Sequence, residues 1–147
     1  MGMPIRGLVH DLSKLLPGEF FPYAAHFYSN GKKAQVRDKT GYYKPEDTGD
    51  RRFDFAWFLH QKRNRHHWQW YAMPTSESGL KCFPMTKKDR KEMLADWRGA
   101  GRAQNTPDTK GWWQKNKDKT FLHAETREWV EKQLEEKKND KGGILQH

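Results

Sequence analysis

The stretch RFDFAWFLHQKRNRHHWQW, residues 52–70, decides the fold that this sequence predicts. Aromatic, imidazole and amide side chains recur in it at intervals of four, three, four and three residues: Phe53, Trp57, His60, Asn64 and His67. This spacing places the five side chains on one stripe of an α-helix, and the stripe changes from aromatic to polar along its length. We therefore predict a helix over 52–70 that begins in the core and turns imidazoles inward at its end. The same geometry points His66 elsewhere.

Apolar side chains with a helical period predict four further helices. These cover residues 5–16, 19–28, 86–99 and 124–137. Thr86 followed by Asp89 is typical of a helix N-terminus, and Gly99 and Gly101 mark the predicted end of that helix. We predict no strand, so the expected fold class is all-α.

Polar segments separate the predicted helices. Residues 32–52 and 102–118 are interpreted as long surface loops, and 72–85 as a connection. With 147 residues, 34% of them hydrophobic, the chain is long enough for one core but not for two. We expect a compact single-domain helical bundle over residues 1–137 and a flexible C-terminal tail over 138–147.

The charge balance and the cysteine count limit the classes of function. The chain has 28 Lys and Arg against 19 Asp and Glu, a net charge of +9, which favours anionic partners such as nucleotides or nucleic acid. Its single cysteine, Cys82, excludes an internal disulfide and fits a reducing compartment; we expect an inert thiol there rather than a nucleophile. No segment approaches the roughly 18 apolar residues of a membrane helix. We expect a cytoplasmic protein with no membrane partner, and a homo-oligomer is compatible with these features.

Two groups of residues have the chemistry of metal ligands. His10 and Asp11 set an imidazole nitrogen beside a carboxylate oxygen on one predicted helix. His60 and His67 lie two helical turns apart, so their rings can face a common point. Asp96 adds a carboxylate from a later helix. Ligands drawn from three helices are the way in which a helical bundle builds an internal metal site.

Three motifs resemble a family of phage and bacterial proteins with the signature of the HD superfamily. They are RGLVHDLSK at 6–14, NRHHW at 64–68 and EMLADWRGAGR at 92–102, and the resemblance spans residues 6–130. It implies a helical fold of the HD type, a divalent metal, and hydrolysis of phosphomonoesters or phosphodiesters, usually on nucleotides. On this basis we expect a metal-dependent phosphohydrolase, in the cytoplasm of a bacterial host if a phage encodes it.

The resemblance also implies roles for individual residues. Five would be ligands of one or two ions of Mn, Mg, Co, Zn or Fe: His10, Asp11, His60, His67 and Asp96. Three would be catalytic: His10, Asp11 and Lys14. We place the cations of Lys14, Arg63 and Arg102 near the phosphate oxygens, and Asn64 where it orients a ligand or the substrate. The ion would lower the pKa of a bound water towards ~7, and the hydroxide would attack phosphorus.

The sequence departs from the superfamily pattern at one position. HD proteins carry a first histidine on a helix before the His-Asp pair, whereas the nine residues before His10 contain none. Three explanations stay open: an ancestral first helix is lost, His26 or another group substitutes, or the site binds metal weakly.

Three other classes of function stay open. The net charge of +9, the run KRNR at 62–65 and the neighbouring Trp68, Trp70 and Tyr71 would suit a nucleic-acid-binding module or a nuclease. Extra histidines would suit an oxygen-activating di-iron enzyme. A catalytically inactive, phage-encoded interaction protein would explain the loss of the first histidine.

Overall fold

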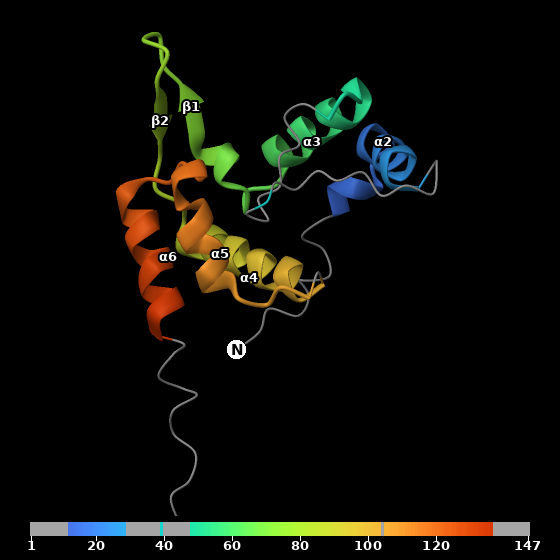
Figure 1. Cartoon of the computed structure of the whole chain (residues 1–147). Coiled ribbons are helices and arrows are strands. Elements are labelled where there is room, and N and C mark those ends of the chain that lie inside the picture. Colours follow the sequence, from blue (N-terminus) through green and yellow to red (C-terminus); the bar gives the residue numbers. More distant parts are fainter. Residues whose placement is uncertain (1–11, 29–38, 40–47, 104, 137–147) are drawn as a thin grey trace, which may run out of the picture. The chain divides into compact units, whose positions relative to one another are not determined.

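The computed structural model describes residues 12–28, 39, 48–103 and 105–136, which are mostly helical (Figure 1). These residues contain five α-helices, three short 3-10 helices and one two-stranded antiparallel sheet. The mostly helical character is therefore confirmed for this part of the chain. The prediction of no strand is wrong, because Ala72–Pro74 and Leu80–Cys82 pair as a short hairpin where a connection was expected. None of the described helices is long and apolar enough to cross a membrane. The chain divides into two compact units, Met1–Trp70 and Tyr71–His147, and the expected single domain over 1–137 stays a prediction.

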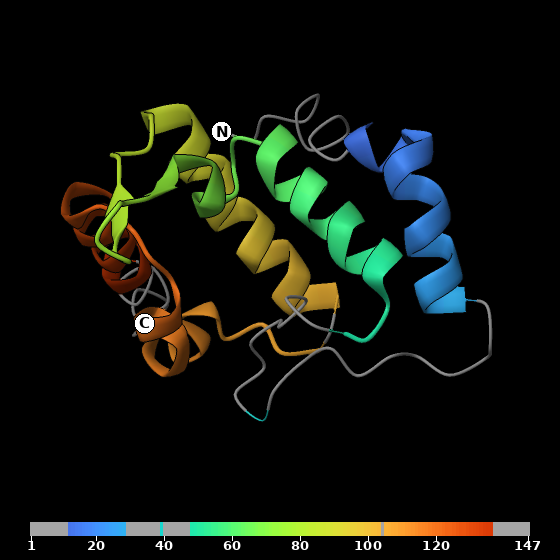
Figure 2. The ribbon, with the colours of Figure 1, turned by 90° about the horizontal axis from the view of Figure 1, so that it is seen from above.

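The first unit is built on two helices, α2 (Pro17–Tyr28) and α3 (Arg51–Arg63), and the 3-10 helix η1 (Leu12–Leu15) precedes them. Figure 2 shows α2 and α3 side by side and running in opposite directions. Proline at the first position of α2 is favourable, because its φ is already helical and its missing N–H would have no partner there. The predicted helix over 19–28 is confirmed. Most of the helix predicted over 5–16 lies outside the described residues, and its last turn is the 3-10 helix η1.

Aromatic rings fill one end of the interface between α2 and α3. Phe53 is fully buried, and its ring stacks on His26 with 3.8 Å between the centroids. Tyr23 and Phe27 meet the same ring edge-on at 5.1 and 5.5 Å. The aromatic half of the predicted α3 stripe is thus core, as its spacing indicated, although Trp57 is only half-buried.

Side-chain caps define both ends of α3. The carboxylate of Asp50 accepts hydrogen bonds from the backbone N–H groups of Arg52 and Phe53, at 3.1 and 3.3 Å. Asn64 adopts an extended conformation, and both its backbone N–H and its side-chain amide donate to the carbonyl of His60. The helix predicted over 52–70 therefore ends at Arg63. A turn follows it, and then the 3-10 helix η2 (Trp68–Tyr71).

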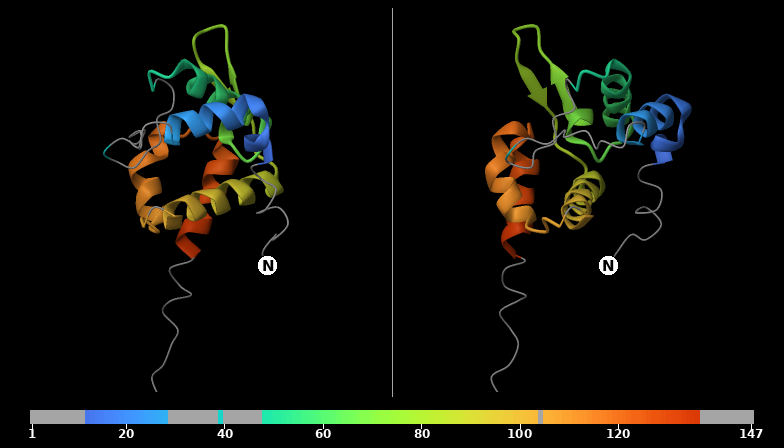
Figure 3. Two further views of the ribbon diagram at one scale, coloured as in Figure 1. Left: turned by 90° about the vertical axis from the view of Figure 1, so that its right-hand side faces the viewer. Right: turned by 45° about the vertical axis from the view of Figure 1, so that its right-hand side comes forward.

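The second unit consists of a β-hairpin and three helices that contact one another (Figure 3). Its elements are β1 (Ala72–Pro74), β2 (Leu80–Cys82), α4 (Lys87–Ala103), α5 (Thr109–Asn116), the 3-10 helix η3 (Lys117–Lys119) and α6 (Ala124–Glu136). In the hairpin Ala72 pairs with Cys82 and Pro74 with Leu80. The buried side chains of Met93, Leu94, Trp113, Val130 and Leu134 form the core.

Two helices of the second unit differ from the prediction. The helix over 86–99 begins as expected, with the Thr86 hydroxyl accepting from the backbone of Asp89, but it continues through both glycines to Ala103. Gly101 instead allows the backbone of Thr106 to come close to the helix, since an added Cβ would lie 2.7 Å from the carbonyl oxygen of Thr106. Helix α5 lies where a loop was predicted. It begins at the cap formed by Asp108, whose carboxylate accepts from the N–H of Gly111.

Burial predicts how two phenylalanines of the same helix differ in stability. Phe53→Ala should lower the free energy of unfolding by about 3–5 kcal/mol, because it leaves a cavity among the rings of α2 and α3. Phe55→Ala is the matched control, since that side chain is 60% exposed and should cost less than about 0.5 kcal/mol. Urea unfolding followed by circular dichroism measures both. Equal losses for the two variants would contradict the assigned core.

Candidate metal centre

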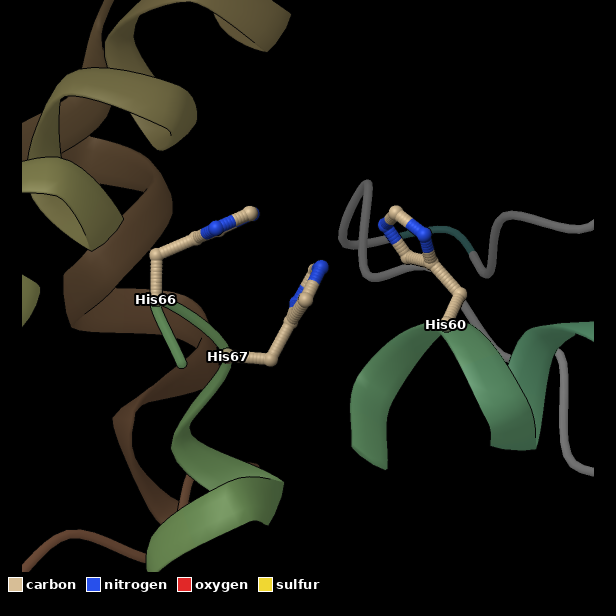
Figure 4. A group of neighbouring side chains, drawn as sticks. All are labelled: His60, His66 and His67. Atoms are coloured by element: carbon tan, nitrogen blue, oxygen red, sulfur yellow. The ribbon is translucent and has the colours of Figure 1, made fainter. Parts of the chain in front are cut away.

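Three histidine side chains of the first unit converge on one point (Figure 4). His60 comes from the last turn of α3, and His66 and His67 come from the turn between α3 and η2. One nitrogen from each ring lies within 4.8 Å of the other two. No other group of three His, Cys, Asp or Glu side chains gathers this closely in the part of the chain that the structure describes.

The burial of the histidine rings suits a divalent cation, whereas their nitrogens are farther apart than a bound ion would require. His60 is 1% exposed and His66 is 4% exposed, so imidazole nitrogens would replace most of the water around an ion. Zinc binds imidazole nitrogen at about 2.0–2.1 Å, which sets tetrahedral ligands about 3.4 Å apart. The present spread of up to 4.8 Å is wider, so the rings would have to draw together around the ion.

The opposite edge of the His60 ring faces a polar network. Its Nδ1 atom lies 3.0 Å from Oε2 of Glu19, 3.1 Å from Oγ of Ser13 and 3.0 Å from Nδ2 of Asn64. Ser13 belongs to η1 and Glu19 to the first turn of α2, so three elements meet at this one nitrogen. The orientation of His60 is therefore set by its contacts with η1, α2 and Asn64.

Glu19 is the centre of this network. Its side chain is fully buried, and both carboxylate oxygens are engaged. Oε1 accepts from Nη1 of Arg63 at 2.7 Å, and Oε2 accepts from the hydroxyl of Ser13 at 2.9 Å while facing Nδ1 of His60. A buried carboxylate is tolerated only when such donors replace its hydration. The positive end of the α2 dipole also favours a carboxylate in the first turn.

The structure brings together part of the ligand set that the sequence predicts. His60 and His67 meet as expected, and His66, which the helical spacing pointed elsewhere, joins them. The reason is that α3 ends at Arg63, so the 100° step of a helix does not apply to the residues after it. The convergence arises from a turn that follows the helix and not from one helical face.

The other predicted metal ligands lie outside the described part of the first unit, as does Arg102, which was predicted to bind substrate. His10 and Asp11 lie outside the described residues. Asp96, which is half-buried, and Arg102, which is exposed, both lie on α4 in the second unit. The roles predicted for these four residues stay predictions.

The substrate-binding residues predicted from the first unit have structural partners. Arg63 forms the ion pair with Glu19, although 39% of its side chain stays exposed. Asn64 donates to Ser13 at 2.7 Å and to the carbonyl of His60 at 2.8 Å, and its role of orienting a ligand or the substrate stays a prediction. Lys14 lies half-buried on η1, beside Ser13 in the chain.

His26 does not take the place of the absent first histidine in this cluster. It packs at the other end of the helix pair, stacked on Phe53, with Nδ1 3.6 Å from the carboxylate of Asp50. The aromatic end of the interface thus contains one histidine and the polar end another.

Sequence reasoning missed Glu19 and Ser13. A signal was present, because Glu19, Tyr23 and His26 follow at intervals of four and three residues and so share one face of α2. That polar and aromatic face matches the stripe on α3, and pairing the two would have brought Glu19 towards His60. Ser13 has no comparable signal in its spacing.

Cys82 has the environment of an inert thiol. Burial raises its pKa, and the nearby positive charge of Arg127 lowers it by less. Its Sγ atom lies 3.5 Å from the carbonyl oxygen of Phe121. A raised pKa leaves little thiolate near neutral pH, and the thiolate is the nucleophilic form.

Comparison with known proteins gives one match. A family model described as a family of unknown function, DUF5662, matches residues 1–136. The comparisons with curated proteins and with solved structures found no match.

The environment of Cys82 predicts slow alkylation. Its rate with iodoacetamide should rise with pH through a midpoint above that of an unperturbed thiol, because the raised pKa delays formation of the thiolate. The same chain unfolded in urea is the control, and its midpoint should return to the ordinary range. A midpoint for the folded chain at or below that of the unfolded chain would contradict this assignment.

Proposed function

Because the chain belongs to DUF5662, a family of unknown function, we propose its activity from the site: a metal-dependent phosphohydrolase that holds its ion with His60, His66 and His67. The observation that supports this is the convergence of three imidazoles, two of them almost fully buried. Imidazole suits Zn²⁺, Co²⁺ and Fe²⁺, whereas Mg²⁺ prefers oxygen ligands. We therefore favour the first three ions over the others that the sequence allowed.

The finer proposal is a site of the HD type, in which His10, Asp11 and Asp96 complete the ligand set. The motifs RGLVHDLSK and EMLADWRGAGR, which carry the resemblance, support these three residues. His67 remains the ligand that the resemblance assigned, and His66 is added to it.

The proposed reaction is hydrolysis of a phosphoester, with a nucleotide as the expected substrate. A bond forms between a water oxygen and phosphorus, the ester bond between phosphorus and oxygen breaks, and the leaving oxygen takes a proton. The ion would supply Lewis acidity and a water of lowered pKa. Lys14 and the exposed part of Arg63 would contact the phosphate oxygens, and the net charge of +9 favours the encounter with an anion. The lone Cys82 supports the proposed cytoplasmic location.

Loss of one ligand should separate metal binding from folding. His60→Gln, His66→Gln and His67→Gln should each lower the metal content and reduce the turnover of nucleotides by more than about 100-fold, because losing even a residue that hydrogen-bonds to a ligand already costs about 10–100-fold in affinity or activity. Elemental analysis and phosphate release from nucleoside mono-, di- and triphosphates measure these effects. His123→Gln is the control, since that half-buried ring accepts from the backbone of Glu125 in the second unit.

Two outcomes would overturn parts of the proposal. Parental metal content in all three variants would end the assigned metal site. Metal bound by these histidines without turnover of any phosphoester would keep the site and end the proposed activity. Asp11→Ala and Asp96→Ala address the HD type in the same assays, because parental turnover in both would leave that finer assignment without support.

A second candidate function, binding of single-stranded nucleic acid, is favoured by the outer face of α3. Arg51, Phe55, Phe58 and Lys62 follow at intervals of four, three and four residues and are all exposed. The two phenylalanine rings lie nearly parallel, with centroids 6.1 Å apart. Cations that flank exposed aromatic rings suit stacking on bases beside a phosphate backbone.

The double variant Phe55→Ala, Phe58→Ala should weaken binding of a labelled single strand by at least about tenfold, since stacking contributes about 1–3 kcal/mol per base. Fluorescence anisotropy at rising salt measures the affinity, which should fall steeply. Phe21→Ala is the matched control, because that ring is 66% exposed on α2 and lies outside the stripe on α3. Unchanged affinity in the double variant would exclude this surface.

A further inference from the structure

We infer that Glu19 is a positioning residue that fixes the tautomer of His60, so that Nε2 of the ring presents its lone pair to a metal ion. The inference rests on the proposed metal site and adds to it the group that prepares the ligand. It is carried by a count of the protons around Nδ1 of His60. Within the described part of the first unit, the Glu19 carboxylate, the Ser13 hydroxyl and the Asn64 amide lie within 3.1 Å of that atom.

The Asn64 amide has no proton left for His60 Nδ1. A primary amide carries two N–H donors. One points to Oγ of Ser13 at 2.7 Å, and the other points to the carbonyl oxygen of His60 at 2.8 Å. Exchanging the nitrogen and oxygen of this amide would place two oxygens 2.8 Å apart, so the orientation is fixed by its contacts.

The Ser13 hydroxyl has no proton left for Nδ1 either. Its oxygen accepts from Asn64, and its single proton is donated to Oε2 of Glu19 at 2.9 Å. The carboxylate of Glu19 has only acceptors, and its Oε2 lies 3.0 Å from Nδ1. Two acceptors at this distance would repel each other, so the proton between them must come from the imidazole.

His60 therefore carries its proton on Nδ1 and donates it to Glu19. Arg63 already balances the charge of Glu19 through its 2.7 Å contact with Oε1, so a neutral imidazole leaves this buried group without net charge. In a neutral imidazole with Nδ1 protonated, Nε2 holds a free electron pair. Carboxylates that accept from the second nitrogen of a ligating histidine fix its tautomer and orientation in the same way.

Glu19→Gln is the most informative substitution, because glutamine has the shape of glutamate but replaces one acceptor oxygen with an NH₂ donor. Arg63 donates to the side chain at position 19, so the amide oxygen should turn towards Arg63 and the amide NH₂ towards His60. Nδ1 of His60 would then act as the acceptor, and its proton would move to Nε2. We expect this exchange of tautomer in metal-free protein, where long-range ¹H–¹⁵N NMR of the imidazole distinguishes the two nitrogens. The His60 signals are identified by their absence in His60→Gln.

Metal affinity is the second readout. Competition of Glu19→Gln with a chromophoric chelator for Zn²⁺ alone should give about 10–100-fold weaker binding than the parent. Asp54→Asn is the matched control. That carboxylate also lies in the first unit, one turn into α3 and far from His60 along the helix, and it accepts hydrogen bonds from Thr48. Its affinity for Zn²⁺ should stay within about twofold of the parent.

Neither readout uses hydrolysis, so this inference and the proposed activity fail separately. A parental spectrum with the His60 proton on Nε2 would overturn the inference, and that measurement does not depend on the folding of Glu19→Gln. Parental Zn²⁺ affinity in a folded Glu19→Gln protein would also overturn it, because a residue that supports only the fold would leave the affinity unchanged.

Discussion

The buried carboxylate of Glu19 is the constraint on which the first unit depends. Removing a carboxylate from water is tolerated only where several donors replace its hydration, and Glu19 receives them from Ser13, His60 and Arg63. These donors belong to η1 and to the last turn of α3. The requirement to satisfy one charge therefore fixes the angle and register of three elements, and it places His60 where its other nitrogen faces His66 and His67.

The end of α3 is the second constraint, and it follows from Asn64. The side chain of an asparagine competes for backbone hydrogen-bonding groups, so asparagine is unfavourable inside a helix and favourable at its end. Here its side-chain amide donates to the His60 carbonyl, which also accepts the last helical hydrogen bond from the Asn64 N–H, and the extended backbone of Asn64 turns the chain. Without this turn His66 and His67 would lie on different sides of a helix. The amide that ends α3 also completes the proton count that orients His60.

The sequence pattern predicted the helices in which the apolar repeat extends over several turns, and it predicted that His60 and His67 lie close together. It placed the end of α3 seven residues too late, since periodicity does not detect the extended backbone and the side-chain cap of Asn64. It missed α5, where the signals were the Asp108 cap and two tryptophans within a polar stretch. Glu19 escaped because a glutamate in a first helical turn is commonly a solvated charge. Its burial depends on a partner 41 residues away, which local spacing does not reveal.

Along the interface between α2 and α3, the rings that stabilise the fold lie at one end and the residues of the candidate site lie at the other. At one end Phe53 and His26 stack, and at the other end Glu19 and His60 form a polar network with Ser13, Asn64 and Arg63. His60 is consequently oriented before any ion arrives, unlike the ligands of a zinc finger, which fold only with their metal. His66 and His67 lie on a turn, which has fewer hydrogen bonds to break than a helix when it moves. An ion held as proposed would need the three nitrogens closer together than their present spread of 4.8 Å, and the residues after α3 are where the backbone has the fewest helical hydrogen bonds to resist that change.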